Sequence, residues 1–155
     1  MKTTRPLKIK TDIEAISILD VYLNGKRDEK TVSTEYRKYK GKLFVAEDFE
    51  DQVIGFVSLS QPVAEDTYII DHLAVLKSHR GLGIGSDLVR FIMDQAKGLG
   101  GCKVYVLLAS WNESGHTFYR KLGFKPSAAL PEYQNEKKNM IWFVLDIVTQ
   151  QYESS

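Results

Sequence analysis

The sequence predicts an α/β domain built around a mixed β-sheet. Helical and strand patterns alternate along all 155 residues without a linker, repeat or low-complexity segment, as is typical of helices layered on a sheet. The run Val104–Ala109 is apolar on both faces, which indicates a strand that helices cover on both sides. A glycine-rich turn, Gly81–Gly85, connects a strand pattern to a helix pattern. We therefore expect a single domain over residues 1–155.

The first part of the chain is expected to form two helices and an antiparallel strand pair. Asp12 is a candidate N-cap for a helix that ends near Gly25. Gly55 is a candidate β-bulge. In order, the predicted elements are a short strand at Leu7–Lys10, a helix from Asp12, a more charged helix at Thr34–Tyr39, and strands at Leu43–Glu47 and Val53–Leu59.

The second part is expected to contain a parallel strand pair joined by a helix. Such a strand–helix–strand crossover is right-handed in nearly all proteins. The predicted elements are a strand at Thr67–Leu76, a helix from Ile84 that stops at Gly98–Gly101, a strand at Lys103–Ala109, a helix at Asn112–Leu122, a loop at Pro131–Lys138 and a last strand at Asn139–Ile147.

The segment Arg80–Ser86 has the composition of an anion-binding turn. Its glycines lack a Cβ atom, so the backbone N–H groups from Gly81 to Ser86 can approach a phosphate closely. The helix that begins here adds free amides and the positive end of its dipole, roughly half a unit charge. A Walker A loop needs Lys where this chain has Ser86, and a dinucleotide fingerprint needs glycine there, so neither motif fits.

Two short motifs stand at the ends of predicted strands. The first is Arg80-x-x-Gly83-x-Gly85, and the second runs from Asn112 through Tyr119 to Gly123-Phe124 in the pattern N-x6-Y-x3-G-F. With both motifs, the chain resembles the GCN5-related N-acetyltransferase (GNAT) family over Ile69–Phe124. This resemblance implies a mixed, mostly antiparallel sheet of six to seven strands flanked by helices, with a central parallel pair that splays apart.

The resemblance also implies which residues bind acetyl-CoA. In the family, the loop holds the pyrophosphate, the motif Asn bonds the pantetheine arm, and strand amides beside the loop bind the thioester and the oxyanion. Carried over to this chain, the expected coenzyme-binding residues are Leu73, Ala74, Val75, Arg80, Gly81, Leu82, Gly83, Ile84, Gly85, Ser86, Asn112 and Tyr119.

Tyr119 and Asp71 are the expected catalytic residues. Acetyl transfer needs a base for the ammonium and a proton donor for the departing thiolate. The phenol of Tyr119, ordinarily with a pKa near 10, stays protonated at pH 7; the alternative is a core aromatic beside Phe118. Asp71 shares strand parity with Leu73 and is the expected base; the alternative is a solvated or salt-bridged strand carboxylate. His72 faces the opposite way and is expected to be a hydrogen-bonded core residue. If Asp71 is not the base, the alternatives are His72 or a chain of water molecules.

Composition excludes several other classes of function. Lys and Arg total 21 against 20 Asp and Glu, a net charge of +1, so we expect no nucleic-acid partner. A single cysteine, Cys102, excludes an internal disulfide and fits a reducing compartment. With no signal-peptide pattern and no apolar run near the roughly 18 residues of a spanning helix, we expect no membrane partner and a cytoplasmic location. No two histidines have metal-ligand spacing, so we expect no metal.

The sequence predicts direct transfer of the acetyl group of acetyl-CoA to a primary amine, because no cysteine is positioned for a covalent intermediate. We expect a small-molecule acceptor, since ribosomal-protein acetyltransferases of the family carry Glu at the position of Leu107, and Trp111 offers a bulky apolar wall instead. A protein or peptide acetyltransferase, a catalytically silent acyl-CoA sensor and a homodimer stay open. Acidic residues that could attract a cationic acceptor, or be ordinary surface charges, are Glu65, Asp66, Glu132 and Glu136.

Overall fold

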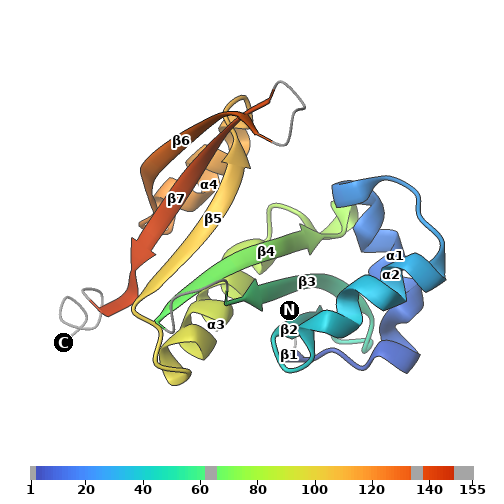
Figure 1. The fold of residues 1–155 in the computed structure, drawn as a ribbon. Helices are drawn as coiled ribbons and strands as arrows, with labels where there is room; N and C mark the ends of the chain where they lie inside the picture. Colours follow the sequence, from blue (N-terminus) through green and yellow to red (C-terminus); the bar gives the residue numbers. More distant parts are fainter. Residues whose placement is uncertain (1–2, 62–65, 134–137, 149–155) are drawn as a thin grey trace. The chain divides into compact units, whose positions relative to one another are not determined.

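A seven-stranded sheet and four α-helices make up the described part of the chain, residues 3–61, 66–133 and 138–148 of a computed structural model (Figure 1). The strands are β1 (Thr3–Pro6), β2 (Leu43–Glu47), β3 (Val53–Ser60), β4 (Thr67–Val75), β5 (Lys103–Ala109), β6 (Lys125–Tyr133) and β7 (Lys138–Asp146). The α-helices are α1 (Ile9–Asn24), α2 (Glu29–Tyr36), α3 (Ile84–Gly98) and α4 (Glu113–Lys121), and the 3₁₀ helices are η1 (Arg37–Tyr39) and η2 (Lys77–His79). The strand order is β1-β2-β3-β4-β5-β7-β6.

Contacts between these elements group the residues into two compact units. Unit 1 falls within Met1–Ser60 and Asp71–Asp94, and unit 2 within Gln61–Ile70 and Gln95–Ser155. The boundary passes through β4 and α3, so both elements contribute residues to both units. The single domain expected over residues 1–155 stays a prediction.

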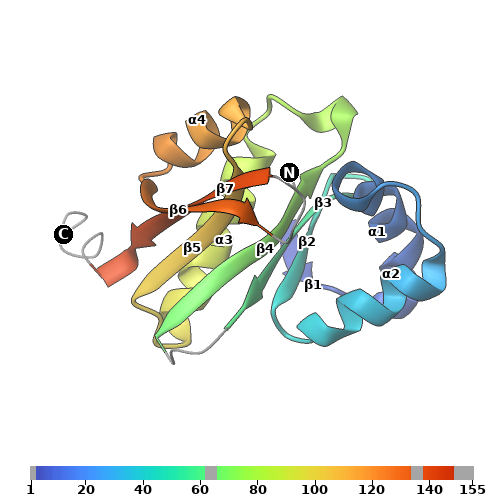
Figure 2. The same ribbon diagram turned by 45° about the horizontal axis from the view of Figure 1, so that its top comes forward.

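Unit 1 packs α1 and α2 against antiparallel strands. β1 pairs with β2, β2 pairs with β3, and all five residues of β2 are buried. The two helices lie side by side in both views (Figures 1 and 2). Their apolar faces and the strands form one core cluster, whose buried members are Ile16, Leu19, Val32, Tyr36, Leu43, Val45, Phe56 and Ala74.

The N-terminal elements begin earlier than the sequence predicts. A strand at Leu7–Lys10 is wrong, because β1 ends at Pro6 and α1 begins at Ile9. Asp12 does not precede this helix as its cap. It lies in the first turn, where its carboxylate accepts the N–H of Lys8 at 2.7 Å and complements the positive end of the helix dipole.

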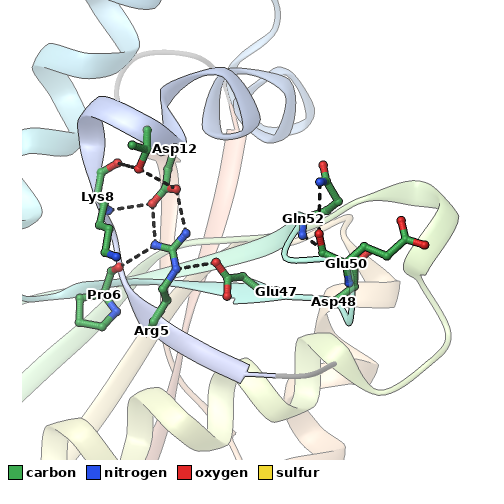
Figure 3. A network of polar contacts seen from close by, with 9 residues as sticks. Arg5, Pro6, Lys8, Asp12, Glu47, Asp48, Glu50 and Gln52 are labelled. Atoms are coloured by element: carbon green, nitrogen blue, oxygen red, sulfur yellow. Dashed lines mark hydrogen bonds and ion pairs between the residues drawn. The ribbon is translucent and has the colours of Figure 1, made fainter.

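Arg5 explains this arrangement, because its guanidinium ties β1 to both α1 and β2. It donates to the two carboxylate oxygens of Asp12 at 2.8 and 2.9 Å and to Glu47 at 2.6 Å (Figure 3). Asp12 is 4% exposed and Glu47 9% exposed, so both carboxylates need a charged partner. Although burial raises the pKa of Asp12, the hydrogen bonds from Arg5 and Lys8 lower it below its ordinary value.

The second helix also begins earlier, at Glu29 rather than Thr34. Asp28 is its N-cap, and the carboxylate accepts hydrogen bonds from the N–H and the hydroxyl of Thr31 at 2.9 and 2.8 Å. The stretch Thr34–Tyr39, predicted as a whole helix, forms the end of α2 and the 3₁₀ helix η1.

The β2–β3 pair confirms the expected bulge. The register shifts from Ala46 opposite Gly55 to Glu47 opposite Val53, so an extra residue lies beside Gly55. The turn between the strands is closed by Asp48, whose carboxylate accepts the backbone N–H groups of Glu50 and Gln52 at 2.9 and 3.0 Å (Figure 3).

Unit 2 contains the parallel pairing and the C-terminal strands. Thr67–Ile70 of β4 lies parallel to Lys103–Val106 of β5, as the sequence predicts. β5 pairs antiparallel with β7, and β7 with β6. Helix α4 packs on β7, where the rings of His116 and Phe143 lie 5.0 Å apart (Figure 2).

The sequence predicts no strand over Lys125–Tyr133, where the structure has β6. Pro126 and Pro131 argue against a central strand, because proline cannot donate to a ladder. β6 lies at the edge of the sheet, where a missing N–H on the open side costs little. The predicted fold class, a mixed and mostly antiparallel sheet of six to seven strands with a central parallel pair and flanking helices, is confirmed.

Candidate functional site

The glycine-rich loop of unit 1 presents a row of main-chain amides. The N–H of Asp87 donates to the carbonyl of Gly83 at 3.0 Å and closes the first turn of α3. Within the described residues, the amides from Gly81 to Ser86 have no hydrogen-bond acceptor. Unpaired N–H groups at a helix start carry partial positive charge and bind anions.

Two glycines in this loop adopt a backbone conformation that L side chains rarely adopt. Gly81 has φ +76° and Gly83 has φ +82°. A Cβ atom built on either residue meets nothing within 4 Å, so the space beside the loop is open. The loop thus fits a diphosphate: its amides are free, its shape depends on glycine, and the space above it is not filled by the protein.

The side chain of Arg80 is directed back onto its own unit. Its Nε donates to the carbonyl of Val75 at 3.1 Å, and its guanidinium carbon lies 4.8 Å from the ring centre of Tyr22 on α1. The ammonium of Lys77 lies 5.6 Å from the same ring. These contacts connect the end of β4 with the loop and with α1.

The backbone of Leu73 and Val75 faces away from β3. The N–H of Leu76 donates to a carbonyl of β3 at 2.8 Å, and successive strand residues direct their N–H groups to opposite edges. The amides of Leu73 and Val75 therefore point to the edge opposite β3, where a thioester oxygen could accept from them. Ala74 approaches β3 so closely that its carbonyl lies 2.9 Å from a Cβ built on Gly55, which explains a glycine at that position.

Asp71 is exposed on β4, and its negative charge acts on the phenol of Tyr39, the last residue of η1. Burial, followed by the negative charges of Asp71 and Glu35, raises the pKa of Tyr39 well above its ordinary value. The Tyr39 phenol is therefore neutral at physiological pH.

His72 is held in a polar and aromatic cluster, as expected for a hydrogen-bonded core residue. Its Nδ1 lies 2.7 Å from the hydroxyl of Ser58 and its Nε2 lies 3.4 Å from Glu35. A carboxylate accepts only, so Nε2 carries the proton toward Glu35, and Nδ1 accepts from Ser58. Burial lowers the pKa of His72 below its ordinary value, although Asp71 and Glu35 oppose that shift.

A buried carboxylate, Asp20, lies at the centre of a second polar network in unit 1. Arg27 donates to it at 2.7 and 2.9 Å, the hydroxyl of Tyr36 at 2.6 Å and the amide of Asn24 at 2.8 Å. Burial raises the pKa of Asp20, but these hydrogen bonds lower it below its ordinary value. Arg27 also binds Glu35 at 2.6 Å, so the network extends to His72.

A cavity of about 720 Å³ runs along α2 and η1. Its lining carries both signs of charge, with Asp28 and Glu35 against Lys30 and Lys38. Tyr39 is also part of this lining, so the cavity extends from α2 to the end of η1. This cavity is hard to predict from the sequence, because α2 is charged and has no clear helical spacing of apolar residues.

In unit 2, Asn112 is the N-cap of α4. Its side-chain oxygen accepts from the N–H of Gly115 at 3.0 Å and from the hydroxyl of Ser114 at 3.2 Å. A Cβ built on Gly115 would lie 2.6 Å from the Asn112 amide nitrogen, so a larger residue there would displace the capping side chain. Trp111, expected as an apolar wall, is 70% exposed.

Tyr119 is buried on the inner face of α4 and is 5% exposed. Its ring makes edge-to-face contacts with Phe118 at 4.9 Å and Phe124 at 5.2 Å. Burial raises the pKa of Tyr119 well above its ordinary value, so the phenol keeps its proton at physiological pH.

Other expected groups contribute little to the site. Of the four acidic residues that could attract a cation, Glu65 and Glu136 lie outside the described residues, Glu132 is described by its backbone alone, and Asp66 is exposed. Across residues 3–61, 66–133 and 138–148, no group of three His, Cys, Asp or Glu side chains could hold a metal ion. No helix in the same ranges is long and apolar enough to cross a membrane.

Comparisons with known proteins identify the family. The profile of the Acetyltransferase (GNAT) family matches residues 13–124. N-alpha-acetyltransferase 30 of Schizosaccharomyces pombe is 32% identical over 107 residues, a match that covers 62% of this chain and 71% of that protein.

Solved structures of low sequence identity share the fold. Ard1 from Thermoplasma volcanium has a TM-score of 0.81 at 23% identity, covering 93% of this chain and 96% of that chain. An aminoglycoside 6'-N-acetyltransferase complexed with coenzyme A has a TM-score of 0.77 at 20% identity, covering 94% and 97%. The chain belongs to the acetyltransferase (GNAT) family and is an N-acetyltransferase that uses acetyl-CoA.

Proposed function

We propose that this enzyme transfers the acetyl group of acetyl-CoA directly to a primary amine, with both substrates bound together. The observation that supports this proposal is the row of unpartnered amides from Gly81 to Ser86, beside which Gly81 and Gly83 leave open space. These amides bind the pyrophosphate of acetyl-CoA. The amides of Leu73 and Val75, directed away from β3, bind the thioester oxygen.

Three groups of the chain have chemical roles in this proposal. Asp71 takes a proton from the acceptor ammonium, because only the free amine is a nucleophile. The amine nitrogen attacks the thioester carbon, and the amides of Leu73 or Val75 stabilise the oxyanion that forms. As the carbon–sulfur bond breaks, Tyr119 gives its phenolic proton to the thiolate, and the proton that the attacking nitrogen releases restores the phenol.

Two classes of acceptor follow from different observations. Leu107 and Trp111 depart from the ribosomal-protein acetyltransferases and favour a small-molecule amine. The 32% identity to N-alpha-acetyltransferase 30 favours the α-amino group of a peptide. The cavity along α2, which carries both signs of charge, is compatible with either class.

A thiol-release assay with acetyl-CoA separates these classes. The acceptors are a set of short peptides with free N-termini, the same peptides with blocked N-termini, spermidine, an aminoglycoside and amino-acid amides. We expect amine-dependent release of coenzyme A, with N-acetylated product detected by mass spectrometry. Fastest release with the free peptides supports a peptide acetyltransferase, and fastest release with the small amines supports the other class. Tight binding of acetyl-CoA without release from any acceptor would identify a silent acyl-CoA sensor and overturn the proposal.

A further inference from the structure

The ring of Tyr22 on α1 lies against two cations from the segment that follows β4. The guanidinium carbon of Arg80 is 4.8 Å from the ring centre, and the ammonium of Lys77 is 5.6 Å from it. Both distances are within the roughly 6 Å at which an aromatic face attracts a cation. Among residues 3–61, 66–133 and 138–148, no carboxylate forms an ion pair with either cation, so the ring takes the place of a counter-charge.

Tyr22 is a fixed support, because the core of unit 1 holds it. Its half-buried side chain packs against the core cluster, and so does Leu76, the residue that follows β4. The backbone of Leu76 is tied to β3, since its N–H donates to the carbonyl of Ile54 at 2.8 Å. In both views the segment after β4 lies beside α1 (Figures 1 and 2). The ring of Tyr22 and the end of β4 are therefore anchored in the same core.

Arg80 connects this support to the glycine-rich loop. Its Nε donates to the carbonyl of Val75 at 3.1 Å, which closes the turn between the strand and the loop. The next residue is Gly81, whose φ of +76° begins the row of free amides. Glycine has more backbone freedom than other residues, so this loop needs an anchor at each end to keep one conformation. The hydrogen bond from Asp87 to Gly83 anchors the far end, and the side chain of Arg80 anchors the near end.

We propose that Tyr22 is a positioning residue for acetyl-CoA, whose ring holds the guanidinium of Arg80 on α1 and thereby keeps the glycine-rich loop in the conformation that receives the pyrophosphate. This inference rests on the proposed binding of the pyrophosphate by that loop. Arg80 then acts through Tyr22 and Val75 rather than by touching a phosphate. Loop conformations that cannot bind lower the apparent affinity in proportion to their population. Because the two side chains act as one unit, the effects of their substitutions are not additive.

The experiment is a double-mutant cycle of Tyr22→Leu and Arg80→Met, with Tyr22→Phe as the conservative variant. Leucine keeps an apolar side chain against the core and removes the aromatic face, whereas phenylalanine keeps that face. The matched control is Arg90→Met, which removes the charge of an exposed arginine on α3 in the same unit. For each variant we measure the Kd of acetyl-CoA by calorimetry, the KM for acetyl-CoA and the kcat with the fastest acceptor of the thiol-release panel, and the Tm.

We expect Tyr22→Leu to raise the Kd and the KM of acetyl-CoA about two- to fivefold, the range of a cation–π contact at an exposed site, with kcat unchanged at saturating acetyl-CoA. Tyr22→Phe should bind acetyl-CoA as the wild type does. Arg80→Met should raise the Kd at least as much as Tyr22→Leu, because it also removes the hydrogen bond to Val75, and the double variant should have the Kd of Arg80→Met. Arg90→Met should leave the Kd near that of the wild type.

Other results overturn the inference and locate the failure. A wild-type Kd for Tyr22→Leu with a lowered Tm would reduce Tyr22 to a structural role. Multiplicative losses in the double variant would show that Arg80 acts on the coenzyme independently of the ring, and tighter binding by Tyr22→Leu would show that the ring withholds the cations from the phosphates. In each of these cases, weakened binding by Gly83→Ala would leave the loop assignment intact. An unchanged Kd in Gly83→Ala would instead overturn that assignment, and the inference with it.

Discussion

Replacing Gly83 with alanine separates what the backbone requires from what the coenzyme requires. At φ +82°, the Cβ of an L residue crowds its own backbone, at a cost of roughly 1–2 kcal/mol. No further steric cost arises in the protein, because that Cβ meets nothing within 4 Å. We therefore expect the Tm to fall by roughly 2–8 °C. The affinity for acetyl-CoA should fall by about tenfold or more, or about 1.4 kcal/mol, because the methyl group projects into the space that the pyrophosphate needs.

Gly100→Ala is the matched control for this variant. Gly100 has φ +87° with nothing within 4 Å of a built Cβ, but it lies in the connection between α3 and β5. Its Tm should fall by a similar amount while calorimetry gives an unchanged Kd for acetyl-CoA. Gly85→Ala tests close approach alone, because Gly85 already lies in α3, where alanine is favourable. If Gly83→Ala bound acetyl-CoA as tightly as Gly100→Ala, the assignment of the loop would be refuted.

Three further predictions follow from the site and the polar networks. Tyr119→Phe should lower kcat by about a hundredfold with the Kd of acetyl-CoA unchanged, and wild-type turnover would reduce Tyr119 to a packing role. Arg27→Met should lower the free energy of unfolding by about 3 kcal/mol in urea denaturation, because it leaves the buried Asp20 without its cation. The control is Arg90→Met, which removes an exposed ion pair with Asp87 and should cost little. An equally small loss of stability in both variants would contradict the network. The pKa of His72 is lowered in the folded protein, so the unfolded chain binds the proton first as the pH falls. The free energy of unfolding should therefore decrease below about pH 6.5, and His72→Gln should flatten that decrease. An unchanged slope in His72→Gln would contradict this role of His72.

Much of the fold could be predicted from local patterns. β2, β5 and α4 lie where the sequence places them, because the two strands are mostly apolar runs and the helix has a clear cap, Asn112. The wrong predictions concern elements whose position depends on contacts between residues far apart in the sequence. β1 forms at Thr3–Pro6 because Arg5 reaches Asp12 and Glu47, and no local pattern shows that network. Its edge position lets β6 tolerate two prolines, and the edge is a property of the whole sheet.

The site divides in the same way. Gly81 and Gly83 could be assigned from sequence, because positive φ is a local demand that glycine meets. The network that connects Asp20, Glu35 and His72 could not, because it joins α1, α2 and β4 through contacts between residues far apart in the sequence. The roles of the expected site residues, the single domain, the cytoplasmic location and a homodimer stay predictions that need experiments of their own.

The most direct test of the account is a titration of ¹⁵N-labelled protein with acetyl-CoA, followed by the amide resonances. We predict that the largest shifts occur at Gly81–Ser86 of the loop and at Leu73 and Val75 of β4. Saturable binding that leaves these amides unchanged would contradict it, because the coenzyme would then be held elsewhere.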